Sequence, residues 1–401
     1  MHHNGSPNRI LVIGGGFSGL TAGIEAAETG AEVIIVEKNP YLGGRVAQLN
    51  KYFPKICPPL CGLEINFRRI KVNPLVKFYT NAEVESISGA PGDYAVKIKL
   101  NPRYVNENCT ACNACTEACP VERDNDFNFG LNKTKAIYLP FEQAFPLRYV
   151  VDRNKCPKDC PAPCVDACKY NAIDLNMQPE TIEVNVNAVI VATGWKPYDA
   201  SKIDNLGFGK VKNVVTNMMF ERIAAKNGPT EGQIIRPSDG KPVEKVAFVQ
   251  CAGSRDENHL PFCSYICCLA SLKHTLYIKE QNPDAEVYIF YIDIRTPGRY
   301  EKFFNEVKEQ NGVNLIKGKV ASIEQDTESD DVIVVAENIL NGEKIKQKVD
   351  MVVLATGMQP EGLEFKVPGL KYAVDGFVID ADGIYSAGCA KNPMDVAGCG
   401  K

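Results

Sequence analysis

The cysteines are the residues of this sequence whose number and spacing most clearly indicate chemistry. The chain has 16 of them in 401 residues, and no apolar run near its start has the length of a signal peptide, so we expect a reducing cytoplasm. Clustered thiols in such a compartment indicate metal or redox chemistry. One group has the spacing C-x2-C-x2-C-x3-C-P, with which a short loop presents thiolates to a [4Fe-4S] cluster: Cys109, Cys112, Cys115 and Cys119. Zinc or a disulfide is the alternative for this group.

A second group of four cysteines follows with looser spacing. Two of its steps are one residue longer than those of the first group, and Lys169 stands where proline is usual. We still expect a [4Fe-4S] cluster at Cys156, Cys160, Cys164 and Cys168. In paired runs of this kind the fourth cysteine ligates the other cluster, so Cys168 is predicted to complete the first cluster and Cys119 the second.

The third group of cysteines interrupts a region expected to resemble a nucleotide-binding unit. The apolar run 246–249 predicts a strand, and in a pyridine nucleotide reductase the turn after it would carry a GxGxxG motif. Here 250–255 reads Gln-Cys-Ala-Gly-Ser-Arg, so we do not expect NAD(P)H to bind. A helix expected over 263–277 would carry three more thiols within about one and a half turns. We predict a third [4Fe-4S] cluster, with plain buried thiols as the alternative, at Cys251, Cys263, Cys267 and Cys268.

A glycine-rich turn near the start predicts a dinucleotide site. The apolar run 9–13 enters Gly-Gly-Gly-Phe-Ser-Gly, and an Ala-rich helical stretch follows. Gly14, Gly16 and Gly19 would supply the tight turn, the approach of the backbone to a pyrophosphate, and the close helix packing. Glu37 ends the next strand, where its carboxylate can accept hydrogen bonds from the ribose hydroxyls of an adenosine.

Further segments favour FAD over NAD as the dinucleotide. The Gly-Gly-Arg segment at 43–45 resembles the one that lies along FAD in flavoproteins with two dinucleotide-binding domains. Two apolar strands end in Ala-Thr-Gly, at 192–194 and 355–357. The candidate FAD contacts from these segments and from the last glycine-rich strand are Gly43, Gly44, Arg45, Thr193, Gly194, Gly357, Gly388 and Cys389. For Cys389, a role as a small buried residue is an equal alternative.

These residues need an α/β framework to position them. Runs of strand length followed by helical stretches begin near residue 9 and again near residue 245, whereas the sequence between about 101 and 176 is rich in Cys, Pro, Asn and Asp. We expect the first part of an FAD-binding Rossmann domain at 1–100, an inserted ferredoxin-like domain at 101–180, the return of the FAD domain and a linker at 181–240, a second Rossmann-like domain at 241–350 and the last part of the FAD domain at 351–401.

The overall composition excludes several classes of function. With 45 basic and 49 acidic residues the net charge is -4, and 45% of the residues are hydrophobic. Nothing in this balance indicates a nucleic-acid surface. The longest apolar runs are of strand length, so we expect no transmembrane span.

Two segments of the third cysteine group carry a family resemblance. Phe-Val-Gln-Cys-Ala-Gly-Ser-Arg at 248–255 and Phe-Cys-Ser-Tyr-Ile-Cys-Cys at 262–268 resemble the hallmark of the A subunits of heterodisulfide reductases. The resemblance implies a thioredoxin-reductase-like flavoprotein with two dinucleotide-binding domains, an inserted ferredoxin-like [4Fe-4S] domain, and a cluster beside the flavin. It also implies that Lys273 lies near the flavin N5 as a catalytic residue, a solvated helix lysine being the alternative. Cys57 and Cys61 match a cysteine pair of the family, whose role stays open.

The resemblance also implies a function and partners. Among the members of this family, the sequence is similar to the A subunit of the quinone-interacting membrane-bound oxidoreductase of sulfate reducers. We therefore expect an oxidoreductase subunit that carries electrons between a membrane quinone or quinol partner and a soluble sulfur-metabolism reductase, adenylylsulfate reductase by resemblance, and that is compatible with flavin-based electron bifurcation or confurcation. The expected location is cytoplasmic, at the inner face of the membrane through another protein of the complex. The alternatives are a non-catalytic flavin scaffold and a soluble heterodisulfide reductase subunit.

Overall fold

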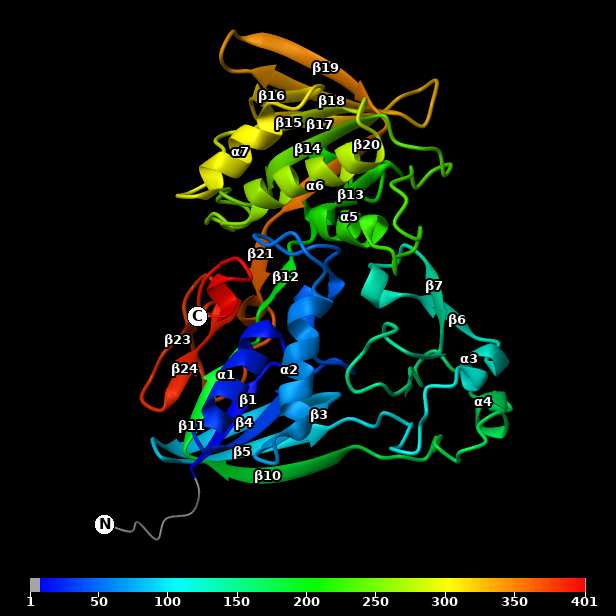
Figure 1. Ribbon diagram of the computed structural model, residues 1–401, viewed down its shortest axis with the longest axis vertical. Coiled ribbons are helices and arrows are strands. Elements are labelled where there is room, and N and C mark those ends of the chain that lie inside the picture. Colours follow the sequence, from blue (N-terminus) through cyan, green and yellow to red (C-terminus); the bar gives the residue numbers. More distant parts are fainter. Residues whose placement is uncertain (1–7, 401) are drawn as a thin grey trace.

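The computed structural model describes residues 8–400, and its first unit is built on a parallel five-stranded sheet (Figure 1). Its first two strands along the chain are mostly apolar and buried, as is typical of parallel strands that are covered on both faces. In spatial order they are β24 (Ile384–Ser386), β11 (Ala188–Val191), β1 (Arg9–Ile13), β2 (Glu32–Glu37) and β3 (Val76–Thr80). Helices α1 (Phe17–Glu28) and α2 (Leu60–Val72) pack beside them.

A three-stranded antiparallel sheet packs on the first sheet and closes its core. It contains β10 (Glu180–Val186), β5 (Asp93–Leu100) and β4 (Ala82–Ala90) in that order. Inward side chains alternate along β5, where Val96 and Ile98 are fully buried against Leu11 and Val189 of the parallel sheet.

The segment between β5 and β10 forms an irregular lobe of its own, drawn in cyan and green in Figure 1. Since β5 and β10 are paired neighbours, the chain leaves and re-enters the first unit at the same edge. The lobe has a small core that includes Cys115, Cys119 and Cys164. Its regular elements are short: α3 (Ala114–Ala118), β6 (Glu122–Asp124), β7 (Lys133–Lys135), β8 (Ile137–Tyr138), β9 (Val150–Val151) and α4 (Pro163–Asp166).

The second unit repeats the plan of the first (Figure 1). Its parallel sheet has the order β13 (Val214–Thr216), β20 (Met351–Thr356), β14 (Lys245–Ala252), β15 (Glu286–Tyr291) and β16 (Val313–Lys317). Its antiparallel sheet contains β17 (Val320–Gln325), β18 (Val332–Asn338) and β19 (Glu343–Val349). The helices are α5 (Asn217–Ala224), α6 (Cys267–Gln281) and α7 (Tyr300–Lys308).

The two units are joined by two chain crossings that pair with each other. The crossings are β12 (Trp195–Pro197) and β21 (Met358–Pro360), and a last small hairpin is formed by β22 (Lys371–Tyr372) and β23 (Val378–Ile379). The fully buried Arg222 of α5 also ties the regions together, because its guanidinium donates to Asn128 Oδ1 of the lobe and to the Gln48 carbonyl of the first unit.

The expected range 241–350 for the second unit is wrong at both ends. Strand β13 and helix α5 belong to this unit although they precede residue 241, and β20 lies inside its sheet between β13 and β14. The Ala-Thr-Gly at the end of β20 does not distinguish the two units, because the segment after β11 carries the same three residues. Across residues 8–400, no helix combines the length and apolar character needed to cross a membrane.

Candidate functional site

The turn between β1 and α1 has the geometry of a dinucleotide-binding turn. Gly14 has φ +107°, and a Cβ there would lie 2.2 Å from the Ala192 carbonyl oxygen. A Cβ on Gly19 would lie 1.9 Å from the Gly14 carbonyl oxygen, so both positions need glycine for packing within the protein. Gly16 differs, because the nearest heavy atom to its Cβ position is the Gly44 Cα at 3.9 Å. The backbone of Gly16 is therefore open to a ligand.

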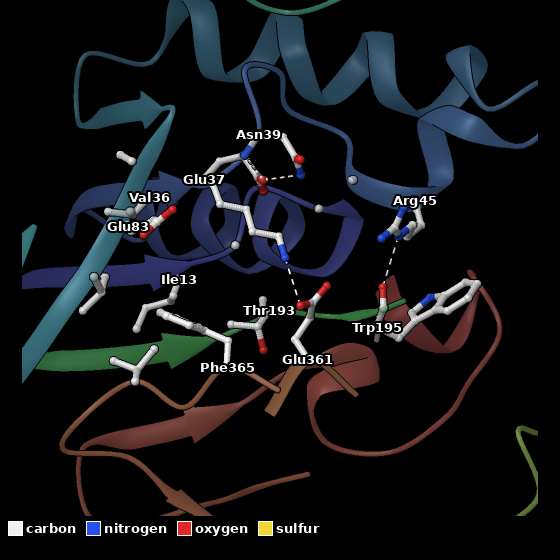
Figure 2. A pocket seen from close by; sticks show the side chains of 18 of the residues that line it. Ile13, Val36, Glu37, Asn39, Arg45, Glu83, Thr193, Trp195, Glu361 and Phe365 are labelled. Atoms are coloured by element: carbon white, nitrogen blue, oxygen red, sulfur yellow. Dashed lines mark hydrogen bonds and ion pairs between the residues drawn. The ribbon is translucent and has the colours of Figure 1, made fainter. Parts of the chain in front are cut away.

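A cavity of about 290 Å³ lies in front of this turn, and we call it the glycine-turn cavity (Figure 2). Its residues come from β1, β2, the segment after β11 and the chain around residue 361. Of the predicted FAD contacts, it is lined by Gly14, Gly16, Glu37, Gly44, Arg45 and Thr193. A dinucleotide needs such a groove with its pyrophosphate at a helix N-terminus, so the residues present fit one.

Glu37 is held rigidly at the end of β2. Its Oε2 accepts from the Gly15 backbone N–H at 2.7 Å, and its Oε1 accepts from the backbone N–H and the side-chain amide of Asn39, each at 2.7 Å. Burial raises the pKa of the Glu37 carboxyl, and these hydrogen bonds act against that rise. The hydrogen bonds fix both carboxylate oxygens beside the cavity (Figure 2).

Other residues of the cavity carried little or no signal in the sequence. The ammonium of Lys38 pairs with Glu361 at 2.9 Å, and both residues line the cavity. Arg45 Nε donates to the Trp195 carbonyl oxygen at 3.2 Å, so the Gly-Gly-Arg segment is bound to the first crossing strand (Figure 2). Of the Lys38–Glu361 pair, only Lys38 lies next to a predicted residue, Glu37. Glu361 comes from the chain directly after the second crossing, far away in the sequence.

A second cavity of about 100 Å³ continues from the first, and we call it the Lys273 cavity. It shares Arg45 and Trp195 with the glycine-turn cavity and is lined from both units. Lys273 and Cys389 are among its residues. The two cavities together suit an extended ligand that passes from the first unit to the boundary with the second.

Lys273 belongs to a buried polar network in the wall of this cavity. Its ammonium lies 2.5 Å from Glu221 Oε1 and donates to the Lys51 carbonyl oxygen at 2.5 Å. His274 Nε2 lies 2.6 Å from the same Glu221 oxygen, and Tyr277 donates to Glu221 Oε2 at 3.3 Å. Burial opposes the Glu221 charge, but Lys273 and His274 prevail and lower the pKa of Glu221 to about 2. Burial lowers the pKa of His274, which favours the neutral imidazole.

The remaining predicted FAD contacts line neither cavity. Gly43 forms an isolated β-bridge with Gly16 and so contacts the turn without lining a cavity. Gly357 packs against the hydroxyls of Ser254 and Ser264 in the second unit, away from the glycine turn. Three more predicted contacts do not line either cavity, although residues close to them in the sequence do: Gly19, Gly194 and Gly388.

The eight cysteines of the lobe gather around two small spaces in an exchanged arrangement. One space is lined by Cys109, Cys112, Cys115 and Cys168. The other is lined by Cys119, Cys156, Cys160 and Cys164. The fourth cysteine of each run thus lies with the first three of the other run. Burial raises the pKa of Cys115 to about 11, so a cation or cluster is needed for that sulfur to be a thiolate.

The third group of cysteines lies where β14 and α6 approach each other. Cys251 lies near the end of β14, where the register is irregular and its φ is +56°, and Cys267 and Cys268 begin the first turn of α6. Burial raises the pKa of Cys267, and negative charge on Cys268, Cys251 or Cys263 would raise it further. Burial raises the pKa of Cys268 to about 11, while the N-terminus of α6 faces this group and favours negative charge.

One correction concerns this group. Cys263 does not lie on the helix, because Tyr265 has φ +65° and the Ser264 hydroxyl accepts from the Met358 backbone N–H, so regular helix begins only at Cys267. In addition, within residues 8–400 no three His, Cys, Asp or Glu side chains surround a site for a single metal ion. A [4Fe-4S] cluster is larger than one ion, and its sulfur ligands stand farther apart.

Comparisons with curated proteins identify relatives over nearly the whole chain. A family model described as FAD dependent oxidoreductase matches residues 9–53. The chain is 39% identical to an iron-sulfur A subunit (the second of two) of the CoB–CoM heterodisulfide reductase of Methanopyrus kandleri, over 97% of this chain and 62% of that protein. It is 40% identical to the corresponding iron-sulfur A subunit of Methanocaldococcus jannaschii, over 96% of this chain and 61% of that protein. The chain therefore spans about three fifths of the length of these relatives.

Solved structures with the same fold are thioredoxin reductases. The enzyme of Lactococcus lactis has a TM-score of 0.53 at 12% identity, with 98% of this chain and 94% of that chain covered. The enzyme of T. acidophilum has a TM-score of 0.51 at 15% identity, with 98% and 93% covered. The predicted fold class, a thioredoxin-reductase-like arrangement of two dinucleotide-binding domains, is confirmed.

The fold, the family match and the cavity beside the glycine turn define a flavoprotein of the FAD dependent oxidoreductase class. Within that class, the chain is similar over nearly its whole length to heterodisulfide reductase A subunits, as the resemblance implied. The names of these relatives describe them as one subunit of a larger reductase. None of the names mentions a quinone or adenylylsulfate reductase.

Proposed function

We propose that this chain is the FAD and iron–sulfur electron-transfer subunit of a larger oxidoreductase complex. The observation that carries the proposal is that one chain holds a dinucleotide cavity and three groups of four cysteines. FAD exchanges two electrons whereas each [4Fe-4S] cluster exchanges one, so their combination converts between the two. The names of relatives support the proposal, because they are iron-sulfur subunits of reductases.

The residues of this chain would divide the work of holding the FAD. The open backbone of Gly16 and the N-terminus of α1 would face the pyrophosphate, and Glu37 would orient the adenosine ribose. The Lys273 cavity would take the flavin ring, with the Lys273 ammonium held in place by its ion pair with Glu221. The buried walls from both units would keep water away from the ring.

Each of the three cysteine groups would hold one cluster. The exchanged cysteines of the lobe support two [4Fe-4S] clusters, the first at Cys109, Cys112, Cys115 and Cys168 and the second at Cys119, Cys156, Cys160 and Cys164. The third cluster would be held by Cys251, Cys263, Cys267 and Cys268. Its helix α6 also carries Lys273, so the third cluster and the proposed flavin ring would be neighbours.

The partner of the complex is of one of two classes. Several relatives are named for a CoB–CoM heterodisulfide and for ferredoxin, which supports a soluble heterodisulfide-type partner. The other class is a membrane quinone or quinol partner coupled to a sulfur-metabolism reductase such as adenylylsulfate reductase, as the sequence resemblance suggested. Recruitment to the inner face of the membrane would then occur through another protein of the complex.

Anaerobic purification from the native source tests the function and the partner together. We expect about one FAD and about twelve irons per chain, with additional subunits that bind either a heterodisulfide-type substrate or a quinone. Photoreduction of the purified complex should then bleach the flavin and produce cluster EPR signals. A complex whose flavin and clusters stay oxidised under these conditions would instead support a non-catalytic scaffold.

A further inference from the structure

Two arginines lie beside the third group of cysteines, and the proposed function gives them no role. Arg255 follows Cys251 by four residues, in the loop that leads from this cysteine towards α6. Arg295 comes from the segment after β15. That segment reaches the group directly, because the Asp293 carbonyl oxygen lies 3.8 Å from the Cys268 Sγ.

Asp293 joins the two arginines to each other. Its Oδ1 forms an ion pair with Arg255 Nη1, and its Oδ2 accepts from Arg295 Nε and Nη2 at 3.4 and 3.3 Å. The backbone also fixes Arg255, whose φ is +57° and whose N–H donates to the Phe262 carbonyl oxygen at 3.0 Å. Two guanidinium groups and one carboxylate leave one uncompensated positive charge, and we call these three residues the arginine triad.

The two arginines hydrogen-bond three of the four cysteines of the group. Burial raises the pKa of Cys251, whereas the charge of Arg255 and a hydrogen bond from its side chain lower it. The backbone N–H of Arg295 hydrogen-bonds Cys268 and so opposes the rise in pKa, to about 11, that burial causes there. Negative charge on Cys263 raises the pKa of Arg295, and a hydrogen bond between their side chains adds to this rise. The triad therefore lies against the sulfurs that would bind iron.

We propose that Arg255 and Arg295, joined by Asp293, raise the reduction potential of the third cluster. This inference rests on the third cluster of the proposed function and names the residues that set how readily it takes an electron. One electron passes from the reduced FAD to the cluster, which gains one negative charge, and no bond forms or breaks. Positive charge and N–H donors at the sulfurs stabilise the reduced cluster more than the oxidised one, so they raise its potential.

A purely structural role accounts less well for the triad. The side chains of Arg255 and Arg295 are 25% and 48% exposed, and ion pairs at such positions contribute little to stability. One arginine would balance the Asp293 charge, whereas the second leaves an excess positive charge beside the cysteine sulfurs. A cluster held by four thiolates is negatively charged, so the excess charge has a partner there. Arg255 should have the larger effect, because water screens its charge less.

The test is a redox titration followed by EPR, on the complete chain purified anaerobically with its cofactors. The third cluster is recognised as the signal that is lost in the variant with Cys267→Ser and Cys268→Ser. At the midpoint potential of the wild type, Arg255→Gln should lower the ratio of reduced to oxidised third cluster about tenfold, which is about 59 mV for one electron. Arg295→Gln should lower this ratio about threefold, since its side chain is more exposed and its charge more screened.

Three further variants separate the effect of charge from an effect on folding. Arg255→Lys keeps the positive charge, so its midpoint should stay closer to that of the wild type than the midpoint of Arg255→Gln. Asp293→Asn removes the negative charge of the triad and should shift the midpoint upwards. Arg68→Gln is the matched control, because Arg68 pairs with Glu64 on an exposed face of α2 in the first unit. Its midpoint should equal that of the wild type.

The iron and FAD contents of each variant show which statement fails. An Arg255→Gln protein with its full iron content and an unchanged third-cluster midpoint would overturn the proposal. If Arg255→Gln loses the cluster, Arg295→Gln decides, and an unchanged midpoint there would overturn it equally. A wild type in which no EPR signal depends on Cys267 and Cys268 would instead contradict the third cluster of the proposed function, and this inference with it.

Discussion

The turn after β1 and the turn after β14 occupy equivalent places in two similar sheets, yet one is lined by open backbone and the other by sulfur and an aromatic ring. Around the first turn, the Cβ position of Gly16 has no neighbour closer than 3.9 Å. Around the second, a Cβ on Gly253 would lie 2.5 Å from the ring of Tyr198. The ring of Tyr198 therefore packs against this turn, and Cys251 stands where the glycines of a dinucleotide-binding turn would be.

This difference shows how one fold can hold two kinds of redox group. In both units the strand order places the turn at the carboxyl end of the parallel strands, where ligands of such sheets bind. The residues of the turn then decide the ligand, because backbone N–H groups suit a pyrophosphate and thiolates suit iron. Fold alone would have suggested a second nucleotide site here, and the site residues argue against it.

The largest expected effect is the loss of FAD when a side chain is added at Gly16 in the turn after β1. Gly16→Val should fold normally, since its side chain meets no protein atom closely, but it should fill the place of the pyrophosphate and abolish FAD binding. FAD content is measured from the absorbance of the purified protein. Gly62→Ala is the matched control, because a Cβ there makes an ordinary contact of 3.7 Å with Phe17. Stoichiometric FAD in Gly16→Val would remove the FAD assignment.

The matching change in the second turn should remove a cluster and leave the flavin. The double variant Cys267→Ser with Cys268→Ser should lose about four irons per chain and one EPR signal. FAD content should stay nearly constant, since both residues belong to the second unit. Cys399→Ser is the control and should retain all iron. An iron count equal to that of the wild type would show that these buried thiols serve packing only.

In the lobe, the fourth cysteine of each run lies with the first three cysteines of the other run. Replacing one fourth cysteine should therefore remove the cluster of the other run and leave the cluster of its own run. Cys119→Ser should damage the cluster beside Cys156, Cys160 and Cys164, and Cys168→Ser should damage the one beside Cys109. EPR spectra of the two variants should therefore lose different signals. If each variant lost the signal of its own run, as judged against Cys112→Ser, the exchanged arrangement would be wrong.

The smallest effect concerns the contact between the two units. Glu221→Gln should lower the free energy of unfolding by about 3 kcal/mol near neutral pH, because Lys273 loses its partner in a buried place. The pKa of Glu221 falls from 4.5 to about 2 on folding, so its contribution is present above about pH 4.5 and is lost as the pH falls towards 2. Denaturant unfolding of both proteins at several pH values measures this difference.

The control for that prediction is Glu64→Gln. The Glu64 carboxylate pairs with Arg68 on an exposed face of α2, where ion pairs contribute little. Its unfolding midpoint should match that of the wild type at every pH. Equal midpoints for Glu221→Gln and the wild type at neutral pH would mean that the buried network does not stabilise the contact between the units.

The features that the sequence predicted correctly depend on local patterns of neighbouring residues. The strand 9–13, the glycine turn and the spacing of the lobe cysteines are local patterns, and the structure has β1, an open Gly16 and two groups of four cysteines there. The start of α6 was missed because Tyr265 takes a left-handed conformation, which its residue type does not indicate.

The features that the sequence did not predict depend on distant segments meeting. Glu221 meets Lys273 and the chain at residue 50 only because α5 and α6 pack on the first unit. Glu361 reaches Lys38 through the second crossing, and Cys399 reaches Cys389 through a loop closed by Asp395. Polar residues scattered along a chain have no periodic pattern that would predict such long-range contacts. Nothing in the sequence around Cys399 indicates a role for it.

An anaerobic reductive titration followed by absorbance and EPR tests most directly that the two units hold different redox groups. Since FAD takes two electrons and each [4Fe-4S] cluster takes one, the wild type should accept about five electrons per chain. The variant with Cys267→Ser and Cys268→Ser should accept about four, with the flavin still taking two. The same count in both proteins, or a flavin signal lost together with the second-unit cysteines, would contradict the account.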